Sequence, residues 1–188
     1  MSFETRVKAL LARGLFNDAA SLAICELGPQ VLSYLHALLR SEADANEVFS
    51  QFAEDFWKGL PGFRGDASVR AWAYRIAWHA SARFVRDPFR QRGRRLETNE
   101  ASRLAGEVKS APEHAWRSER VAQLREALDP EEKTLLILRV DRGLSWHDVA
   151  LVLGEESAAP PREATLRKRF ERLKEKLSKA AREQGLID

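Results

Sequence analysis

The stretch FRGDASVRAWAYRIAWH, residues 63–79, begins as a glycine-containing turn and continues as a helical pattern. The apolar residues that recur at intervals of three and four, and that we expect to face a core, are Val69, Trp72, Ala73, Ile76, Ala77, Ala80 and Phe84. The opposite side carries Arg75, His79, Arg83 and Arg86. Aromatic and basic side chains together can stack unpaired bases and hold a phosphate backbone. The pattern therefore indicates opened DNA or RNA as a ligand.

The basic character continues beyond the helix, since six arginines stand against one acid, Asp87, between Arg83 and Arg95. Such a strip attracts phosphates independently of sequence. Trp78 lies between Arg75 and His79, near the polar side, where burial is difficult. An alternative interpretation is a core helix in which Trp72 and Tyr74 pack inward, followed by a solvated basic tail.

Working outward, the chain predicts an all-α fold, because β-branched residues are sparse and no sustained alternation of apolar and polar residues occurs. The helices expected before the Phe63 turn cover residues 3–13, 19–26, 30–40 and 44–60. We expect Gly28-Pro29 to separate the second helix from the third, with Pro29 at the start of the third, and Pro61-Gly62 to end the fourth.

The composition changes after Arg95: residues 97–112 are rich in small, polar and acidic side chains. We interpret this segment as part of a linker over residues 96–115 that joins two small helical domains, residues 1–95 and 116–188. A helical pattern returns over residues 112–128.

The C-terminal domain has strong local signals. Asp129, Pro130 and Glu132 are placed to start a helix, predicted over residues 130–141 and ended by Arg142-Gly143. Ser145 and Asp148 have the spacing of a capping box before a short helix that runs to Leu153. After a turn over residues 155–161, a long helix is predicted from its apolar stripe of Leu166, Phe170, Leu173 and Leu177.

The short helix and the long helix have the proportions of a helix-turn-helix, whose second helix reads the major groove. Opposite the apolar stripe, the long helix carries the basic residues Arg167, Lys168, Arg169, Arg172 and Lys174. These can contact phosphates and, through arginine, guanine edges. The alternative is an amphipathic helix whose basic face is only solvated.

Other classes of function find little support. The single cysteine, Cys25, cannot form an internal disulfide, and His36, His79, His114 and His147 share no ligand spacing. Neither a metal site nor a cofactor is predicted, and no catalytic arrangement identifies an enzyme. No apolar run approaches the roughly 20 residues of a spanning helix, and no basic-then-apolar signal occurs, so we expect a cytoplasmic protein without a membrane association.

The chain resembles bacterial sigma factors of the extracytoplasmic-function class, which keep regions two and four of the sigma-70 family. The residues that carry the resemblance are Asp44-Ala45, Val48 to Leu60, the block Phe63 to Ser68 with Trp72 and Tyr74 to Ala77, Leu144 to Gly154, and Ala164 to Phe170. The likeness covers residues 5–180. It implies two helical domains, of region 2 and region 4, in a promoter-specific initiation factor that binds core RNA polymerase and melts DNA.

The resemblance also implies a role for particular residues. Those implied to capture and support the melted minus-ten element are Phe63, Arg64, Gly65, Asp66, Ala67, Ser68, Trp72, Tyr74, Arg75, Trp78, His79 and Arg83. Those implied to read the minus-thirty-five element are Thr165, Arg167, Lys168, Arg169 and Arg172. Those implied to bind the clamp helices of the polymerase β′ subunit are Asp44, Glu47, Val48, Gln51 and Phe52. The β flap and an anti-sigma factor are further partners that the class implies.

This sequence departs from the family pattern at three places. Ser50-Gln51 replaces a glutamine followed by an acid in the polymerase-binding helix, and His79 stands where relatives often carry asparagine. The turn over residues 155–164 is longer than usual for the family.

Two other classes of function are compatible with the sequence. A helix-turn-helix regulator would bind duplex DNA without polymerase, although it would not need the Phe63 turn. A protein-interaction module would use its basic faces only for solvation or for an acidic partner.

Overall fold

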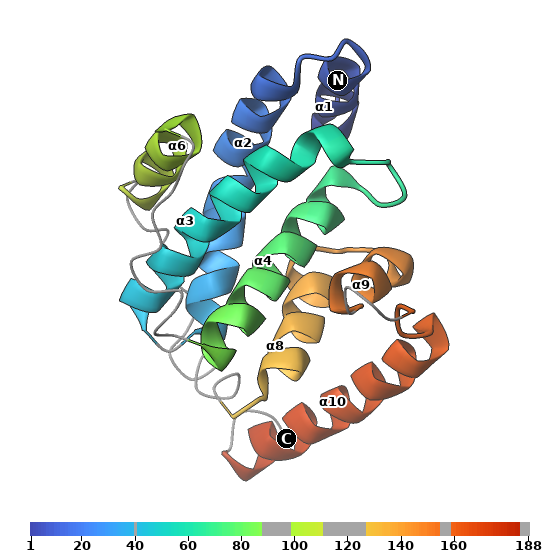
Figure 1. The fold of residues 1–188 in the computed structure, drawn as a ribbon. Helices are drawn as coiled ribbons and strands as arrows, with labels where there is room; N and C mark the ends of the chain where they lie inside the picture. Colours follow the sequence, from blue (N-terminus) through green and yellow to red (C-terminus); the bar gives the residue numbers. More distant parts are fainter. Residues whose placement is uncertain (40, 88–98, 111–126, 155–158, 185–188) are drawn as a thin grey trace. The chain divides into compact units, whose positions relative to one another are not determined.

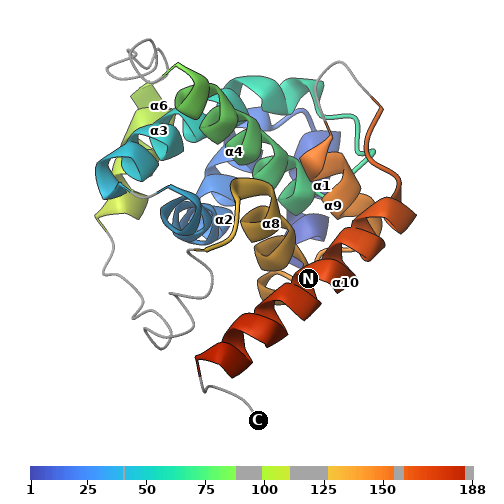
Figure 2. The same ribbon diagram turned by 90° about the horizontal axis from the view of Figure 1, so that it is seen from below.

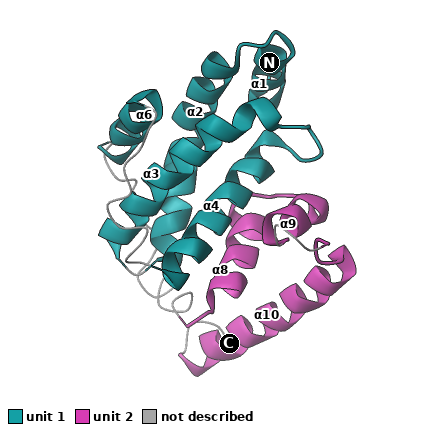
Figure 3. Ribbon diagram, viewed as in Figure 1, with its two compact units in different colours: residues 1–111 teal, residues 112–188 magenta. Residues whose placement is uncertain are grey.

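A computed structural model describes residues 1–39, 41–87, 99–110, 127–154 and 159–184. The chain divides into two compact units, Met1–Ala111 and Pro112–Asp188 (Figure 3). Every regular element in the described residues is helical, so the predicted all-α fold is confirmed. None of the described helices combines the length and the apolar character that crossing a membrane requires.

Unit 1 is built around three packed helices. Its described elements are α1 (Phe3–Ala12), α2 (Phe16–Leu38), α3 (Glu42–Gly59), the short 3-10 turn η1 (Leu60–Gly62), α4 (Val69–Arg86) and α6 (Asn99–Lys109). Helices α2, α3 and α4 contact one another pairwise, and α1 contacts α2 and α4 (Figures 1 and 2). Helix α6 packs against α2 and α3, on the side of α3 opposite to α4 (Figure 1).

Aromatic side chains fill the core of unit 1. Tyr34 of α2 meets Tyr74 of α4 edge to face, with ring centroids 5.5 Å apart, and both side chains are buried. Along α3, Phe49, Phe52 and Phe56 stack in sequence at centroid distances of 5.5 and 5.7 Å. Such edge-to-face and offset pairs add to the stabilisation that burial of the rings provides. Aromatic side chains from all three helices therefore contribute to the core of unit 1.

The predicted interruption at Gly28-Pro29 is wrong, because α2 runs unbroken from Phe16 to Leu38 with Pro29 inside it. A proline inside a helix removes the hydrogen bond to the carbonyl four residues earlier, here that of Cys25. Both residues lie on the exposed side of α2, where water can hydrate that carbonyl. Gly28 faces the other way: a β carbon there would lie 2.9 Å from a γ carbon of Val108 in α6. The glycine permits this close approach of two helices.

The segment predicted as a linker differs from that expectation in its described part, because residues 99–109 form α6 and belong to unit 1. The side chains that α6 buries are Ala101, Leu104 and Ala105. Their spacing is helical, but two of the three are alanines. The weak apolar contrast of alanine explains why the composition resembles that of a linker.

The described residues of unit 2 form α8 (Pro130–Leu136), its π-helical continuation η2 (Ile137–Asp141), α9 (Trp146–Leu153) and α10 (Glu163–Glu183). Both predicted helix starts are confirmed. Glu132 N–H donates to Oδ1 of Asp129 at 2.8 Å while the Glu132 carboxylate accepts from Asp129 N–H at 3.2 Å, which completes a capping box. Ser145 Oγ accepts from Asp148 N–H at 3.0 Å. The helix predicted over residues 112–128 lies mostly outside the described residues.

Helix α10 is the long helix against which α8 and α9 pack (Figures 1 and 2). Leu128, Leu136 and Leu173 form a buried cluster, with Phe170 and Leu177 packed against it. Leu166 is also fully buried. The predicted apolar stripe of α10 therefore packs against the rest of unit 2, and the basic face of the helix is exposed to solvent.

Candidate nucleic-acid interface

The turn between η1 and α4 is exposed in the middle and fixed at both ends. Arg64, Gly65 and Asp66 are exposed. Gly65 has φ +81°, a conformation that residues with a β carbon rarely adopt. At the far end, Ser68 caps α4 by accepting a hydrogen bond from Ala71 N–H at 3.0 Å. The tip of the turn is thus presented to solvent on a defined backbone.

An aromatic stack supports the base of the turn. The Trp72 ring lies between Phe56 of α3 and Phe63 of the turn, at centroid distances of 4.8 and 5.3 Å. Gly59 makes room for it, since a β carbon there would lie 3.2 Å from the Trp72 ring. Phe63 remains half-buried. Trp72 therefore holds Phe63 in place from below.

Glu4 of α1 ties the beginning of the chain to the beginning of α4. Its Oε2 accepts from Val69 N–H and its Oε1 from Arg70 N–H, both at 3.0 Å. These two backbone donors belong to the first turn of a helix and have no partner inside it. A carboxylate there also interacts favourably with the helix dipole. The sequence gives no local signal for this contact, because the residues are 65 and 66 positions apart.

The outward side of α4 carries Arg75, Trp78 and His79, which are half-buried, and Arg86, which is exposed. These four residues share one face of the helix, as their spacing predicts. Trp78 retains partial access to solvent and lies one turn from Arg75. This face has the mixture of a flat aromatic ring and positive charge that binding of a single strand requires.

Tyr74 does not lie on that face. Its side chain is fully buried against Tyr34, in agreement with the alternative in which this tyrosine packs inward. This burial does not fit the role in DNA binding that the resemblance implies for Tyr74. We assign Tyr74 to the core of unit 1.

Arg83 joins two helices of unit 1. Its guanidinium pairs with Oδ2 of Asp55 on α3 at 2.6 Å. Oδ1 of the same carboxylate accepts from Nε2 of Gln51 at 2.6 Å. Asp55 thus bridges Gln51 on α3 and Arg83 on α4.

The residues implied to bind polymerase are divided by the structure. Val48, Gln51 and Phe52 are buried, and two of them form part of the apolar core. Asp44 and Glu47 are half-buried and lie nearer the surface of α3. Direct contact with a partner is therefore open to Asp44 and Glu47 alone among these five.

The basic face of α10 is exposed over its first half, where Thr165, Arg167, Lys168, Arg169 and Arg172 all lie at the surface. Arg167 pairs with Glu163 at 3.1 Å, and Arg169 pairs with Glu131 of α8. Within the described residues, Lys168 and Arg172 have no acidic partner.

Trp146 at the start of α9 connects the two helices of the helix-turn-helix. Its ring meets Phe170 of α10 edge to face at 5.6 Å. The guanidinium groups of Arg139 and Arg167 lie 4.9 and 5.9 Å from the centre of the same ring. Such cation–π contacts hold the two arginines near the indole. Sequence reasoning did not assign Trp146 this role.

Some predicted features lie outside the described residues. They include the arginines from Arg90 to Arg95 and most of the long turn before α10. Among the described residues, His, Cys, Asp and Glu do not gather in any group of three that could hold a metal ion.

Comparison with known proteins adds the family. The model of sigma-70 region 2 matches residues 24–92, which include α3, the exposed turn and α4. RNA polymerase sigma-H factor of Pseudomonas aeruginosa is 30% identical over 170 residues, covering 80% of this chain and 83% of its own length. The chain belongs to the sigma-70 family of RNA polymerase sigma factors.

A second relative agrees with this family. RNA polymerase sigma factor YlaC of Bacillus subtilis is 27% identical over 129 residues, 66% of this chain and 73% of that protein. The predicted resemblance to sigma factors of the extracytoplasmic-function class is thereby confirmed. As a sigma factor the protein is a promoter-specific transcription initiation factor that binds core RNA polymerase and promoter DNA, and it is not an enzyme.

Proposed function

We propose that this sigma factor recognises and melts the minus-ten element with unit 1 and recognises the minus-thirty-five element with unit 2. One observation carries the first part: the exposed tip of the turn, residues 64–66, is fixed at both ends and precedes the outward face of α4 with Trp78 and Arg75. A flipped base would enter the turn, and the neighbouring face would hold the strand that follows.

The energetics favour capture of bases that are already leaving the duplex. Flipping a base costs a few kcal/mol of unstacking, and stacking on an aromatic side chain returns about 1–3 kcal/mol per base. Both indoles are half-buried, but the Trp72 ring already contacts Phe56 and Phe63. We therefore assign base contact to the turn and Trp78, and support of the turn to Trp72.

For the minus-thirty-five element, we propose that α10 enters the major groove with its exposed N-terminal half. Lys168 and Arg172 are available for phosphate or base contacts, while Arg167 is placed by Glu163 and Trp146. Arginine presents two parallel donors that match the guanine edge.

For core polymerase, we propose that α3 binds the β′ clamp helices through the side that carries Asp44 and Glu47, and that unit 2 contacts the β flap. The acidic character of these two residues suits a basic partner surface. A protein that works with polymerase on chromosomal DNA would act in the cytoplasm.

The experiment that tests this combination is an opening assay. Purified chain and core polymerase are incubated with a promoter mapped in the genome of the source, and unpaired thymines are detected by permanganate reactivity. Opening that requires both components supports the proposal. Duplex binding without dependence on polymerase would favour a simple helix-turn-helix regulator, and neither activity would leave a protein-interaction module.

A further inference from the structure

Helix α6 covers part of α3. Lys109 Nζ at its C-terminal end donates to Oγ of Ser50 on α3 at 2.8 Å. Helix α2 also contacts α6 here. Gly28 leaves room for Val108 of α6, and a β carbon added at Gly28 would lie 3.3 Å from the ring of Phe49 on α3. Beneath this helix Ser50 is only 8% exposed.

The covered residue lies in the stretch of α3 proposed to bind polymerase, because Ser50 and Glu47 are three positions apart and share one side of the helix. The Ser50 hydroxyl donates to the Asn46 carbonyl at 3.1 Å while it accepts from Lys109. Lys109 therefore occupies polar surface of α3 beside a residue proposed to dock on polymerase.

We propose that α6 is an intramolecular competitor for the polymerase-binding face of α3, and that core polymerase binds after α6 has left this face. The inference rests on the proposed contact between α3 and the β′ clamp helices. In the free sigma factor α6 covers this part of α3, which we call the closed state. In the open state α6 is detached and polymerase can bind.

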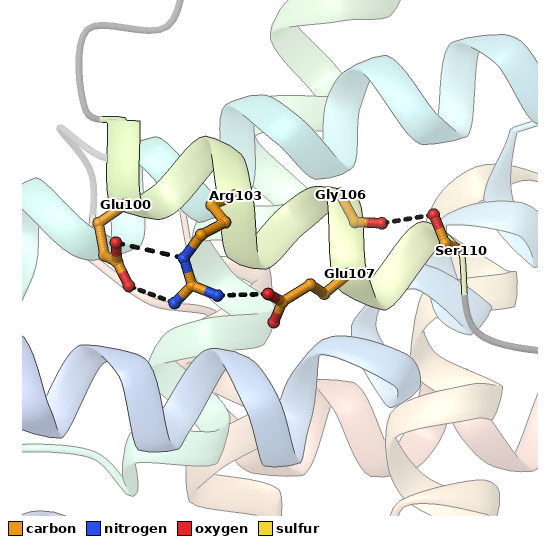
Figure 4. A network of polar contacts seen from close by, with 5 residues as sticks. All are labelled: Glu100, Arg103, Gly106, Glu107 and Ser110. Atoms are coloured by element: carbon orange, nitrogen blue, oxygen red, sulfur yellow. Dashed lines mark hydrogen bonds and ion pairs between the residues drawn. The ribbon is translucent and has the colours of Figure 1, made fainter.

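The contacts of α6 are suited to release. Its fully buried side chains are one leucine and two alanines, and the half-buried Val108 adds a contact at Gly28, so the apolar surface that opposes detachment is limited. Its exposed face is held by bonds within the helix, because Arg103 pairs with both Glu100 and Glu107 (Figure 4). The hydrogen bond from Arg103 holds the pKa of Glu100 below its ordinary value. An isolated helix of this length is marginal in water, so detachment and unwinding of α6 would accompany each other.

The first test compares full-length variants in binding to core polymerase. Leu104→Glu places a charge in the packed face of α6 and should open it. A ligand that binds only the open state gains affinity in proportion to that population. If the open state is about 1–10% populated, as is common for minor states, binding should tighten by about 10- to 100-fold.

The control is Lys8→Ala, which removes an exposed charge from α1 and should leave polymerase affinity near that of the unchanged protein. Thermal unfolding followed by circular dichroism checks that Leu104→Glu leaves the rest of unit 1 folded. Unchanged or weaker binding by a folded Leu104→Glu variant would overturn the inference.

A second test closes the site covalently and does not depend on destabilising α6. A β carbon at residue 28 would lie 2.9 and 3.3 Å from the two γ carbons of Val108, which brings the β carbons into the range that a disulfide spans. In the triple variant Cys25→Ser, Gly28→Cys, Val108→Cys, the oxidised protein should lose polymerase binding and the reduced protein should regain it. Equal binding in both redox states would contradict the proposal.

A third variant separates this inference from the proposed function. Glu47→Arg should abolish polymerase binding both alone and combined with Leu104→Glu, if α3 is the docking helix. Loss by Glu47→Arg without any effect of opening or locking α6 would overturn the inference alone. No effect of Glu47→Arg would overturn the proposed α3 contact together with the inference.

Discussion

The carboxylate of Glu4 accepts a hydrogen bond from the backbone N–H of Arg70 at 3.0 Å, across 66 positions of sequence. With the parallel bond from Val69, this contact makes α1 the cap of the helix that we propose holds melted DNA. The N-terminal helix therefore positions the exposed turn, although it contributes no side chain to the proposed DNA interface.

We predict that Glu4→Ala destabilises unit 1 by about 0.5–2 kcal/mol, the usual cost of losing a helix cap. The start of α4 would also become less well defined, so promoter opening should fall more than binding of duplex DNA. Urea unfolding and permanganate reactivity measure the two effects. Glu4→Gln keeps one acceptor oxygen and should be intermediate, and Lys8→Ala on the same helix is the control. Equal loss with Lys8→Ala would speak against a specific cap.

Gly65→Ala should disturb the turn through its backbone alone. The residue has φ +81°, and nothing lies within 4 Å of an added β carbon, so any effect comes from conformation. The left-handed region costs about 1–2 kcal/mol for a residue with a β carbon. We expect the free energy of promoter opening to become less favourable by about that amount. Gly62→Ala, which has equal space and no positive φ, should have little effect, and a similar loss there would contradict the explanation.

Trp78→Ala should reduce promoter opening more than duplex binding, because the proposed stacking partner is an unpaired base. A loss of about 1–3 kcal/mol is the range for one stacked base. Val85→Ala removes an exposed apolar side chain from the same helix and serves as the control. If both DNA states were affected equally by Trp78→Ala, the indole would belong to the packing of unit 1.

On α10, Arg167→Ala should weaken promoter binding by about 1–3 kcal/mol and relax specificity if its guanidinium reads a base, whereas Lys168→Ala should lower the salt dependence by about one ion. Titrations of minus-thirty-five duplexes at several salt concentrations distinguish the two. Lys179, exposed near the other end of the helix, supplies the control variant Lys179→Ala. Unchanged affinity in Arg167→Ala and Lys168→Ala would exclude this face as the reader.

Much of the fold follows from local patterns in the sequence. Asp129 and Ser145 mark helix starts that the structure confirms, because caps depend on neighbours only three positions away. The apolar stripe of α10 is equally local. Features set by distant partners were predicted poorly: Pro29 sits inside α2, and α6 forms where alanine gives little apolar contrast.

The same distinction applies to the candidate site. The exposed turn and the outward face of α4 follow from residue types and spacing. Burial of Tyr74 against Tyr34, and the pairing of Arg83 with Asp55, depend on which helix lies alongside. No local pattern contains that information, so the sequence leaves both inward packing and DNA contact open for Tyr74 and does not predict the ion pair of Arg83.

The bridge from Gln51 through Asp55 to Arg83 joins the helix proposed for polymerase with the helix proposed for DNA. If this bridge couples polymerase binding to DNA binding, the coupling free energy is the same in both directions. If docking on α3 strengthens the grip of α4 on an opened strand, then the opened strand must strengthen docking by the same factor. Loss of that strand as the polymerase leaves the promoter would then loosen the sigma factor from the enzyme, and a single carboxylate would contribute to the timing of its release.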